Sequence, residues 1–168
     1  MKFEENFYKL LKKLHKLEFF DEILERENTE NLGEWFDKLN FEKNEILRLG
    51  SIGISELPDD LFEDFPSLKY LDLGGNEIKT IPEGFFDRCR EIRYLNLSGN
   101  KLNILPNHLF DNLPDLIALG LRKNELEDLP DDLFENLNKL EQLALDGNNL
   151  KKEPDSIKSL QKLKNYRI

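Results

Sequence analysis

The six letters LPDDLF occupy residues 57–62 and return unchanged at residues 129–134. Two looser copies lie between them, IPEGFF at 81–86 and LPNHLF at 105–110, so the copies begin 24 residues apart. A fixed period of roughly 20 to 50 residues is typical of proteins built from stacked repeats. One copy alone buries too little apolar surface to offset the entropy lost on folding, so each unit must pack on its neighbours. The spacing therefore predicts a repetitive, stacked architecture.

One complete unit, residues 68–91, indicates how each part of the period folds. Its LDL stretch at 71–73 alternates apolar and polar side chains, which predicts a strand. Asn76 follows where the chain must turn, and its side chain can satisfy backbone groups that a turn leaves unpaired. Pro82 begins an extended return path, and Phe86 fills the far side of the coil. Stacked copies predict an asparagine ladder and a phenylalanine spine: Asn76, Asn100, Asn124 and Asn148, and Phe62, Phe86, Phe110 and Phe134.

The pattern LxxLxLxxNxLxxLPxxxFxxLxx over residues 44–168 resembles the leucine-rich repeat, in the 24-residue "typical" class of Toll-like and lamprey variable lymphocyte receptors. The resemblance implies an α/β fold, a right-handed horseshoe solenoid with a parallel sheet on its concave side. Irregular or short helical segments would cover the convex side. About five repeats and a final strand are implied, with a non-enzymatic binding module as the function. Receptor members carry cysteine-rich caps, whereas this chain has only Cys89, which argues against a receptor role.

Residues 1–43 precede the first repeat and show helical spacing instead of strand alternation. Their apolar side chains recur at intervals of three or four residues: Phe3, Phe7, Leu10, Leu14 and Leu17. We expect this segment to form a helical N-terminal cap on the first strand. An alternative interpretation starts from the five lysines and two glutamates of residues 1–17. It takes them as a basic amphipathic helix that docks on a membrane surface or a partner.

Charge and composition exclude several classes of function. The formal charge is −10, and because residues 1–17 carry +3 and residues 151–168 carry +4, the middle carries −17. Such a surface repels phosphates, so we expect no nucleic-acid binding. No apolar stretch approaches the roughly 18 residues of a membrane span. A single cysteine and a charged N-terminus without a secretory signal favour a cytoplasmic location, with a bacterial effector secreted without a cleaved signal as the alternative.

Catalytic and metal-binding residue types are sparse. The only histidines, His15 and His108, have no second ligand at zinc-binding spacing. Cys89 shares the repeat position of Phe65 and Leu113, which predicts a buried core residue. The acidic residues of PDDLFED at 58–64 fall on a return loop, where a solvated surface is the expected role. We therefore expect no enzymatic activity, metal or cofactor; the alternative is a recognition fragment of a larger bacterial effector-like enzyme.

Side chains between the strand leucines point away from the core and form the concave face. Tyr70 and Tyr94 fall on neighbouring strands with Ile46 next in line, and tyrosine and arginine are frequent interface anchors. We therefore predict that this face binds a protein or peptide; alternatively, the tyrosines only support the sheet. The predicted site consists of Ile46, Arg48, Lys69, Tyr70, Asp72, Arg93, Tyr94, Asn96, Ile117 and Arg122.

The last unit departs from the repeat. Glu153 replaces the leucine before the proline, Lys158 replaces the spine phenylalanine, and the closing NYRI at 165–168 predicts one more strand. Lysines near this end would discourage pairing between sheet edges. We expect a monomer, with a dimer through the edge at Tyr166–Ile168 as the alternative.

Overall fold

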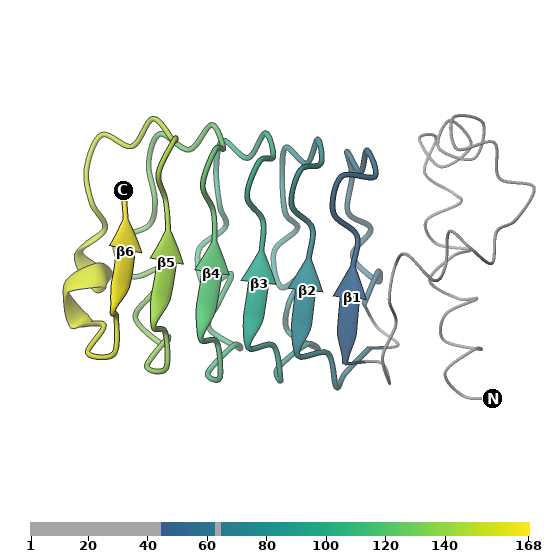
Figure 1. Cartoon of the computed structure of the whole chain (residues 1–168), viewed down its shortest axis with the longest axis horizontal. Coiled ribbons are helices and arrows are strands. Elements are labelled where there is room, and N and C mark those ends of the chain that lie inside the picture. Colours follow the sequence, from purple (N-terminus) through teal and green to yellow (C-terminus); the bar gives the residue numbers. More distant parts are fainter. Residues whose placement is uncertain (1–44, 63–64) are drawn as a thin grey trace, which may run out of the picture.

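The chain winds into a solenoid whose strands lie side by side in a single parallel sheet (Figure 1). This computed structural model describes residues 45–62 and 65–168. The elements are β1 (Ile46–Arg48), β2 (Tyr70–Asp72), β3 (Tyr94–Asn96), β4 (Ala118–Gly120), β5 (Gln142–Ala144), the 3₁₀ helix η1 (Asp155–Ser159) and β6 (Asn165–Arg167). The six strands follow one another across the sheet in chain order. The predicted solenoid with a parallel sheet is confirmed, whereas the expected cap over residues 1–43 and the alternative helix over 1–17 lie outside the described residues.

Each strand spans three residues, with one inward side chain between two outward ones, and the inward residue is leucine in β1–β5 and Tyr166 in β6. In β2, Leu71 is fully buried while Tyr70 and Asp72 are half-buried. Leu71 pairs with Leu95 of the next strand, so equivalent positions of consecutive repeats lie next to one another. The final pairing aligns Leu143 with Tyr166, which confirms the predicted last strand in a unit one residue shorter. Because the register follows the repeat, every outward position forms a row that runs across the whole sheet.

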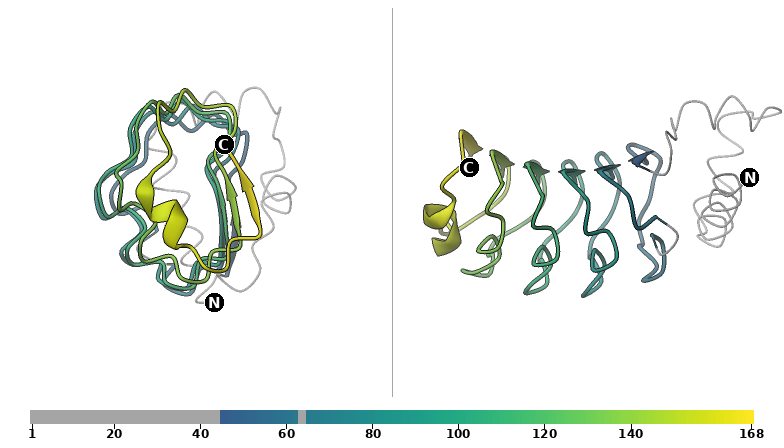
Figure 2. Two further views of the ribbon diagram at one scale, coloured as in Figure 1. Left: turned by 90° about the vertical axis from the view of Figure 1, so that its left-hand side faces the viewer. Right: turned by 90° about the horizontal axis from the view of Figure 1, so that it is seen from below.

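The return side of the solenoid consists of successive tight turns rather than long helices. Leu61 N–H donates to the Pro58 carbonyl at 3.0 Å, and Leu133 N–H donates to the Pro130 carbonyl at 3.2 Å. Among the described residues, the only helix is η1 in the last unit. Figure 2 shows these turns superimposed along the solenoid axis, with the sheet on the opposite side. The expected irregular or short-helical convex side is confirmed.

A phenylalanine spine runs through the interior on the return side. The rings of Phe86 and Phe110 stack with centroids 6.3 Å apart, and those of Phe110 and Phe134 with centroids 6.2 Å apart. Phe62 is buried too, but its ring meets Phe85 edge-on, and Phe85 in turn meets Phe86 edge-on. Phe85 stands where three other repeats have leucine and the last has Ile157, so its larger ring fills the space between the first two members of the spine.

The predicted asparagine ladder is present and joins consecutive turns. Asn100 Nδ2 donates to the carbonyls of Leu73 and Leu97, both at 3.0 Å, and its Oδ1 accepts from Ile78 N–H at 3.1 Å. Asn76, Asn124 and Asn148 make the equivalent bonds in their own turns. Each amide therefore satisfies backbone groups of its own turn and of the preceding one, where water has little access.

One turn position after each strand requires a left-handed backbone. Gly75, Gly99 and Gly147 occupy it with φ of 69°, 70° and 76°. Ser51 and Lys123 occupy the same repeat position with φ of 59° and 53°. Glycine adopts this conformation without a Cβ penalty, whereas other residues reach it at some cost. Lys123 consequently places a charged side chain just beyond β4, where the neighbouring repeats have none.

Four of the five lysines near the C-terminal end pair with acidic residues of the same chain. Lys151 meets Glu127, Lys152 meets Asp131, Lys158 meets Asp155, and Lys164 meets Glu141, at distances between 2.7 and 2.9 Å. These are exposed pairs, which contribute little to stability. On the last strand, the Tyr166 hydroxyl donates to Glu153, and burial together with this bond raises the tyrosine pKa. Ile168 stays 58% exposed, and a dimer through this edge remains a prediction.

Candidate functional site

The outward side chains of β1 to β6 form one face of the sheet, which we call the open face. Two rows run across it, with neighbouring strands about 4.8 Å apart. The first row holds Ile46, Tyr70, Tyr94, Ala118, Gln142 and Asn165, and the second holds Arg48, Asp72, Asn96, Gly120, Ala144 and Arg167. Side-chain size drops at β4 in both rows. We call β1–β3 the aromatic half and β4–β6 the hollow half.

Ring contacts fill the aromatic half. The rings of Tyr70 and Tyr94 lie 6.2 Å apart with a tilt of 35°. The guanidinium of Arg48 lies 5.2 Å from the centre of the Tyr70 ring, within the range of a cation–π contact. Tyr94, at the boundary with β4, is 44% exposed and is the largest uncovered aromatic surface among the described residues. The two tyrosines therefore support each other, and one of them also offers a ring to solvent.

The polar side chains of the aromatic half already bond within the chain. Asn96 Nδ2 donates to Asp72 Oδ1 at 2.8 Å, and Asn96 Oδ1 accepts from Ser98 N–H at 3.0 Å. Lys69 Nζ lies 2.8 Å from Glu45 Oε1 beside the first row. These contacts hold the side chains in fixed positions and leave fewer free donors and acceptors for a ligand.

The predicted site residues do not gather at one place. Six lie on the open face of the aromatic half: Ile46, Arg48, Tyr70, Asp72, Tyr94 and Asn96. Lys69, Arg93 and Ile117 flank the first row, each immediately before a strand. Arg122 lies two residues beyond β4, in the hollow half. The structure thus separates Arg122 from the other predicted polar residues.

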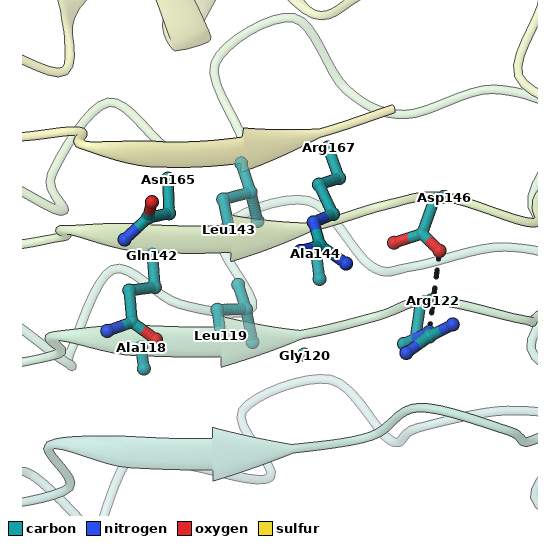
Figure 3. Close-up of a pocket in the computed structure, with 10 residues that line it drawn as sticks. All are labelled: Ala118, Leu119, Gly120, Arg122, Gln142, Leu143, Ala144, Asp146, Asn165 and Arg167. Carbon is teal, nitrogen blue, oxygen red and sulfur yellow. Dashed lines mark ion pairs between the residues drawn. The ribbon is translucent and has the colours of Figure 1, made fainter.

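A hollow of about 470 Å³ lies over the hollow half, lined by side chains of three neighbouring strands (Figure 3). Its floor consists of the small residues Ala118, Gly120 and Ala144, which expose the edges of Leu119 and Leu143. Of the residues that line this hollow, the predicted site included only Arg122. The sequence feature that could have revealed the hollow is the run of small residues Ala118, Gly120 and Ala144. They occupy outward strand positions at which β1–β3 carry larger side chains such as tyrosine, arginine and asparagine.

Gly120 marks the boundary between the two halves. A Cβ at this position would lie 2.7 Å from Ser98 Oγ and 2.8 Å from Asn96 Oδ1. Both atoms belong to the β3 repeat and lean toward β4. The side chains of the aromatic half therefore occupy the space above Gly120 on one side, whereas on the other side Ala144 leaves it open.

Charged groups lie at the carboxyl ends of the strands in the hollow half. Arg122 Nε lies 3.4 Å from Asp146 Oδ2, and Figure 3 draws this ion pair. Asp146 Oδ1 is buried and accepts no hydrogen bond from any described residue. Arg167 extends from β6 toward Ala144, and the amides of Gln142 and Asn165 lie at the opposite end of the hollow.

A second concavity of about 400 Å³ lies on the return side. Four acidic residues and two phenylalanines contribute to its lining, together with Gly84 and Arg88: Asp59, Asp60, Glu83, Asp87, Phe62 and Phe85. Within residues 45–62 and 65–168, no group of three or more histidine, cysteine or acidic side chains is arranged to hold a metal ion. His108 lies on another return loop, with its Nδ1 3.0 Å from Asp111.

Comparison with protein families agrees with this geometry. The family model described as "Leucine rich repeat" matches residues 44–102 and 100–150. This chain belongs to the leucine-rich-repeat family. A comparison of this leucine-rich-repeat protein with curated proteins gave no match.

Solved structures of leucine-rich-repeat proteins are similar to this chain. The leucine-rich repeat domain of APL1B is 30% identical over 66% of this chain, with a TM-score of 0.65. A leucine-rich-repeat protein of Leptospira interrogans is 33% identical over 67% of this chain, with a TM-score of 0.59. An internalin from Listeria monocytogenes shares the fold at 23% identity over 74% of this chain, with a TM-score of 0.60. This chain covers only 28% to 34% of the length of those chains.

Membership indicates a general role for this leucine-rich-repeat protein. The fold is commonly a protein-binding scaffold, and its members are generally non-enzymatic binding modules. In the part of the chain that the structure describes, no helix combines the length and apolar character needed to cross a bilayer.

Proposed function

We propose that this leucine-rich-repeat protein is a non-enzymatic module that binds a protein or peptide segment across the open, concave face of its sheet. The hollow beside Tyr94 supports this proposal most directly. A volume of about 470 Å³ falls within the range of roughly 300 to 1,000 Å³ that ligand-binding concavities occupy. A peptide lying across the strands would place one side chain in the hollow and rest another on the exposed Tyr94 ring.

The floor of the hollow suits such a role. Its apolar lining is already arranged on a rigid sheet, so a ligand would not have to order it. Ala118, Gly120 and Ala144 lose little side-chain entropy when covered, because they have few or no rotatable bonds. Polar groups at both ends of the strands would set the direction of a bound segment.

Selection from a phage-displayed random-peptide library on the immobilised chain provides probes for a test. Titration of the isotope-labelled chain with a selected peptide should shift the amide resonances of β4–β6 and Tyr94. Ala144→Tyr, which fills the hollow, should weaken binding by about tenfold or more. Asn103→Tyr adds the same ring on the exposed return path and should leave binding unchanged.

Two results would overturn the proposal. One is a selected peptide that binds Ala144→Tyr as tightly as the unmodified chain and shifts only return-side resonances. The other is a selection that yields no peptide with affinity above that for a blank surface. The aromatic contribution is tested separately by changing Tyr70 and Tyr94 together to alanine, which should also weaken a peptide that contacts Tyr94.

A further inference from the structure

We infer that the hollow half recognises a carboxylate-bearing side chain, so that the bound segment is an acidic peptide. This inference rests on the proposed function and adds the chemical class of the ligand. The two halves of the open face differ in charge.

The strands and flanking turns of the hollow half are basic within an acidic chain. Residues 115–123, 139–147 and 162–168 carry six basic and three acidic side chains, a net charge of +3. The equivalent residues 43–51, 67–75 and 91–99 carry four basic and three acidic side chains, a net charge of +1. The formal charge of the whole chain is −10. The positive region therefore coincides with the hollow, where field lines of a concave surface concentrate.

Two arginines, Arg122 and Arg167, face the hollow and have guanidinium N–H groups that are not held in strong contacts. The Arg122–Asp146 distance of 3.4 Å is longer than the roughly 2.7–2.9 Å of a strong charge-assisted bond. The two side chains are 45% and 29% exposed, so water screens the pair and it contributes little. The Arg167 carbonyl accepts from Leu145 N–H, but its exposed guanidinium makes no hydrogen bond or ion pair with any described residue. A ligand carboxylate can therefore bind between the two guanidinium groups without breaking a strong contact.

Asp146 favours a peptide over a small anion. Its Oδ1 is buried without a hydrogen-bond partner among the described residues, an arrangement that destabilises a carboxylate oxygen. When Arg122 turns toward a ligand, Asp146 needs a donor in its place. A peptide segment can supply a backbone N–H to Asp146 while its own acidic side chain meets the arginines. A free anion has only the second of these groups.

The other charged residues around the hollow agree with this assignment. On the amino-terminal side, Glu141 is paired with Lys164, and Asp115 is paired with Lys139, which lowers the aspartate pKa. These acidic groups are therefore neutralised within the chain. Lys123, exposed just beyond β4, adds a further positive charge near Arg122.

The test uses the intact chain and the same phage-displayed peptide library. Selected peptides should be enriched in aspartate and glutamate relative to the starting library. Replacing the acidic residue of a selected peptide by its amide should weaken binding by about tenfold, and so should the double variant Arg122→Gln with Arg167→Gln. Affinity should also fall with added salt. Both arginines are exposed, so melting curves should show that the double variant keeps its fold.

A matched control is Lys79→Gln with Arg90→Gln, which removes the same charge from exposed positions outside the open face. It should leave affinity unchanged, and an equal loss in this control would overturn the assignment to the hollow. Selected peptides that lack acidic residues but still lose affinity in Ala144→Tyr would overturn the carboxylate inference and leave the proposed function standing. Peptides that Ala144→Tyr does not affect would overturn both.

Discussion

The two halves of the open face have the same backbone and different surfaces. In the aromatic half, Tyr70, Tyr94 and Arg48 cover the strands and contact one another. In the hollow half, Ala118 and Ala144 occupy the same rows and leave about 470 Å³ uncovered. Both halves rest on fully or almost fully buried leucines that pair in register. A repeat fold therefore allows the outward rows to change from one strand to the next without altering the core.

The strongest test of this comparison is whether the two halves share a single core. Leu95 and Leu119 are each 2% exposed and pair across the boundary. Leu95→Ala and Leu119→Ala should each lower the free energy of unfolding by about 2–5 kcal/mol, because each leaves a cavity in packed surroundings. Urea denaturation measures both. Costs that differ by more than about 2 kcal/mol would show that the cores of the halves are not equivalent.

Gly120→Ala tests the boundary itself. The added Cβ would meet Ser98 Oγ and Asn96 Oδ1 at less than 3 Å, and the Asn96 oxygen is held by the Ser98 N–H. We expect a loss of about 1.5 kcal/mol in unfolding free energy, since overpacking outweighs the gain from a stiffer unfolded chain. Ala144→Ser, one strand further along the same row, should stay within about 0.5 kcal/mol. Equal effects would mean that the boundary is not at Gly120.

Cys89 lies beneath the aromatic half, at the position that Leu137 occupies beneath the hollow half. Burial raises its pKa from 9.0 to about 12. Between these two pKa values the folded chain keeps a thiol proton that the unfolded chain loses. The free energy of unfolding should therefore have its full value below about pH 9 and fall as the pH rises toward 12. Relative to Cys89→Ala, the unmodified chain should lose about 1–2 kcal/mol of unfolding free energy between pH 7 and pH 10.

A cysteine placed at the equivalent position of the other half tests whether the interior is equally buried beneath both halves. Leu137→Cys in the Cys89→Ala background moves the thiol beneath the hollow half. Chemical denaturation from pH 7 to pH 10 should show the same loss, because both positions are almost fully buried. A pH dependence confined to Cys89 would indicate that the interior under the hollow half opens to water.

The smallest expected effect concerns the tyrosine pair. A double-mutant cycle with Tyr70→Ala and Tyr94→Ala should give a coupling of about 0.5–1.5 kcal/mol, the value typical of aromatic pairs. A cycle with Tyr70→Ala and Gln142→Ala, which spans both halves, should give a coupling near zero. Thermal and urea denaturation of the single and double variants provides the four free energies. Coupling near zero for the tyrosines would mean that each ring acts separately on the surface.

Much of the fold could be predicted from the spacing of a few residue types. The 24-residue recurrence of Leu71, Asn76 and Phe86 was enough to predict the strand, the ladder and the spine. These features repeat because each turn solves the same packing problem with local sequence. The Phe85 contacts could not be predicted in this way, since they depend on ring orientations within one particular gap of the core.

The candidate site was harder to predict because it depends on relations between strands. The aromatic pair was visible in the sequence, since tyrosine is conspicuous at an interface position. Ala118, Gly120 and Ala144 were not singled out, because small residues draw attention only when their neighbours on three adjacent strands are considered together. The same holds for Arg167, which reaches the hollow from a unit one residue shorter than the others.

The sequence by itself determined the period, the inward leucines and the asparagine turns, because these depend on residues close together in the chain. Only the tertiary structure decided where the open face is filled and where it is hollow. That outcome depends on how large, how oriented and how charged the residues are at positions 23 or 24 apart, such as Gly120 with Asn96 and Ala144 with Arg167. Parallel pairing brings these side chains within contact distance, and no local pattern in the chain encodes the space left between them.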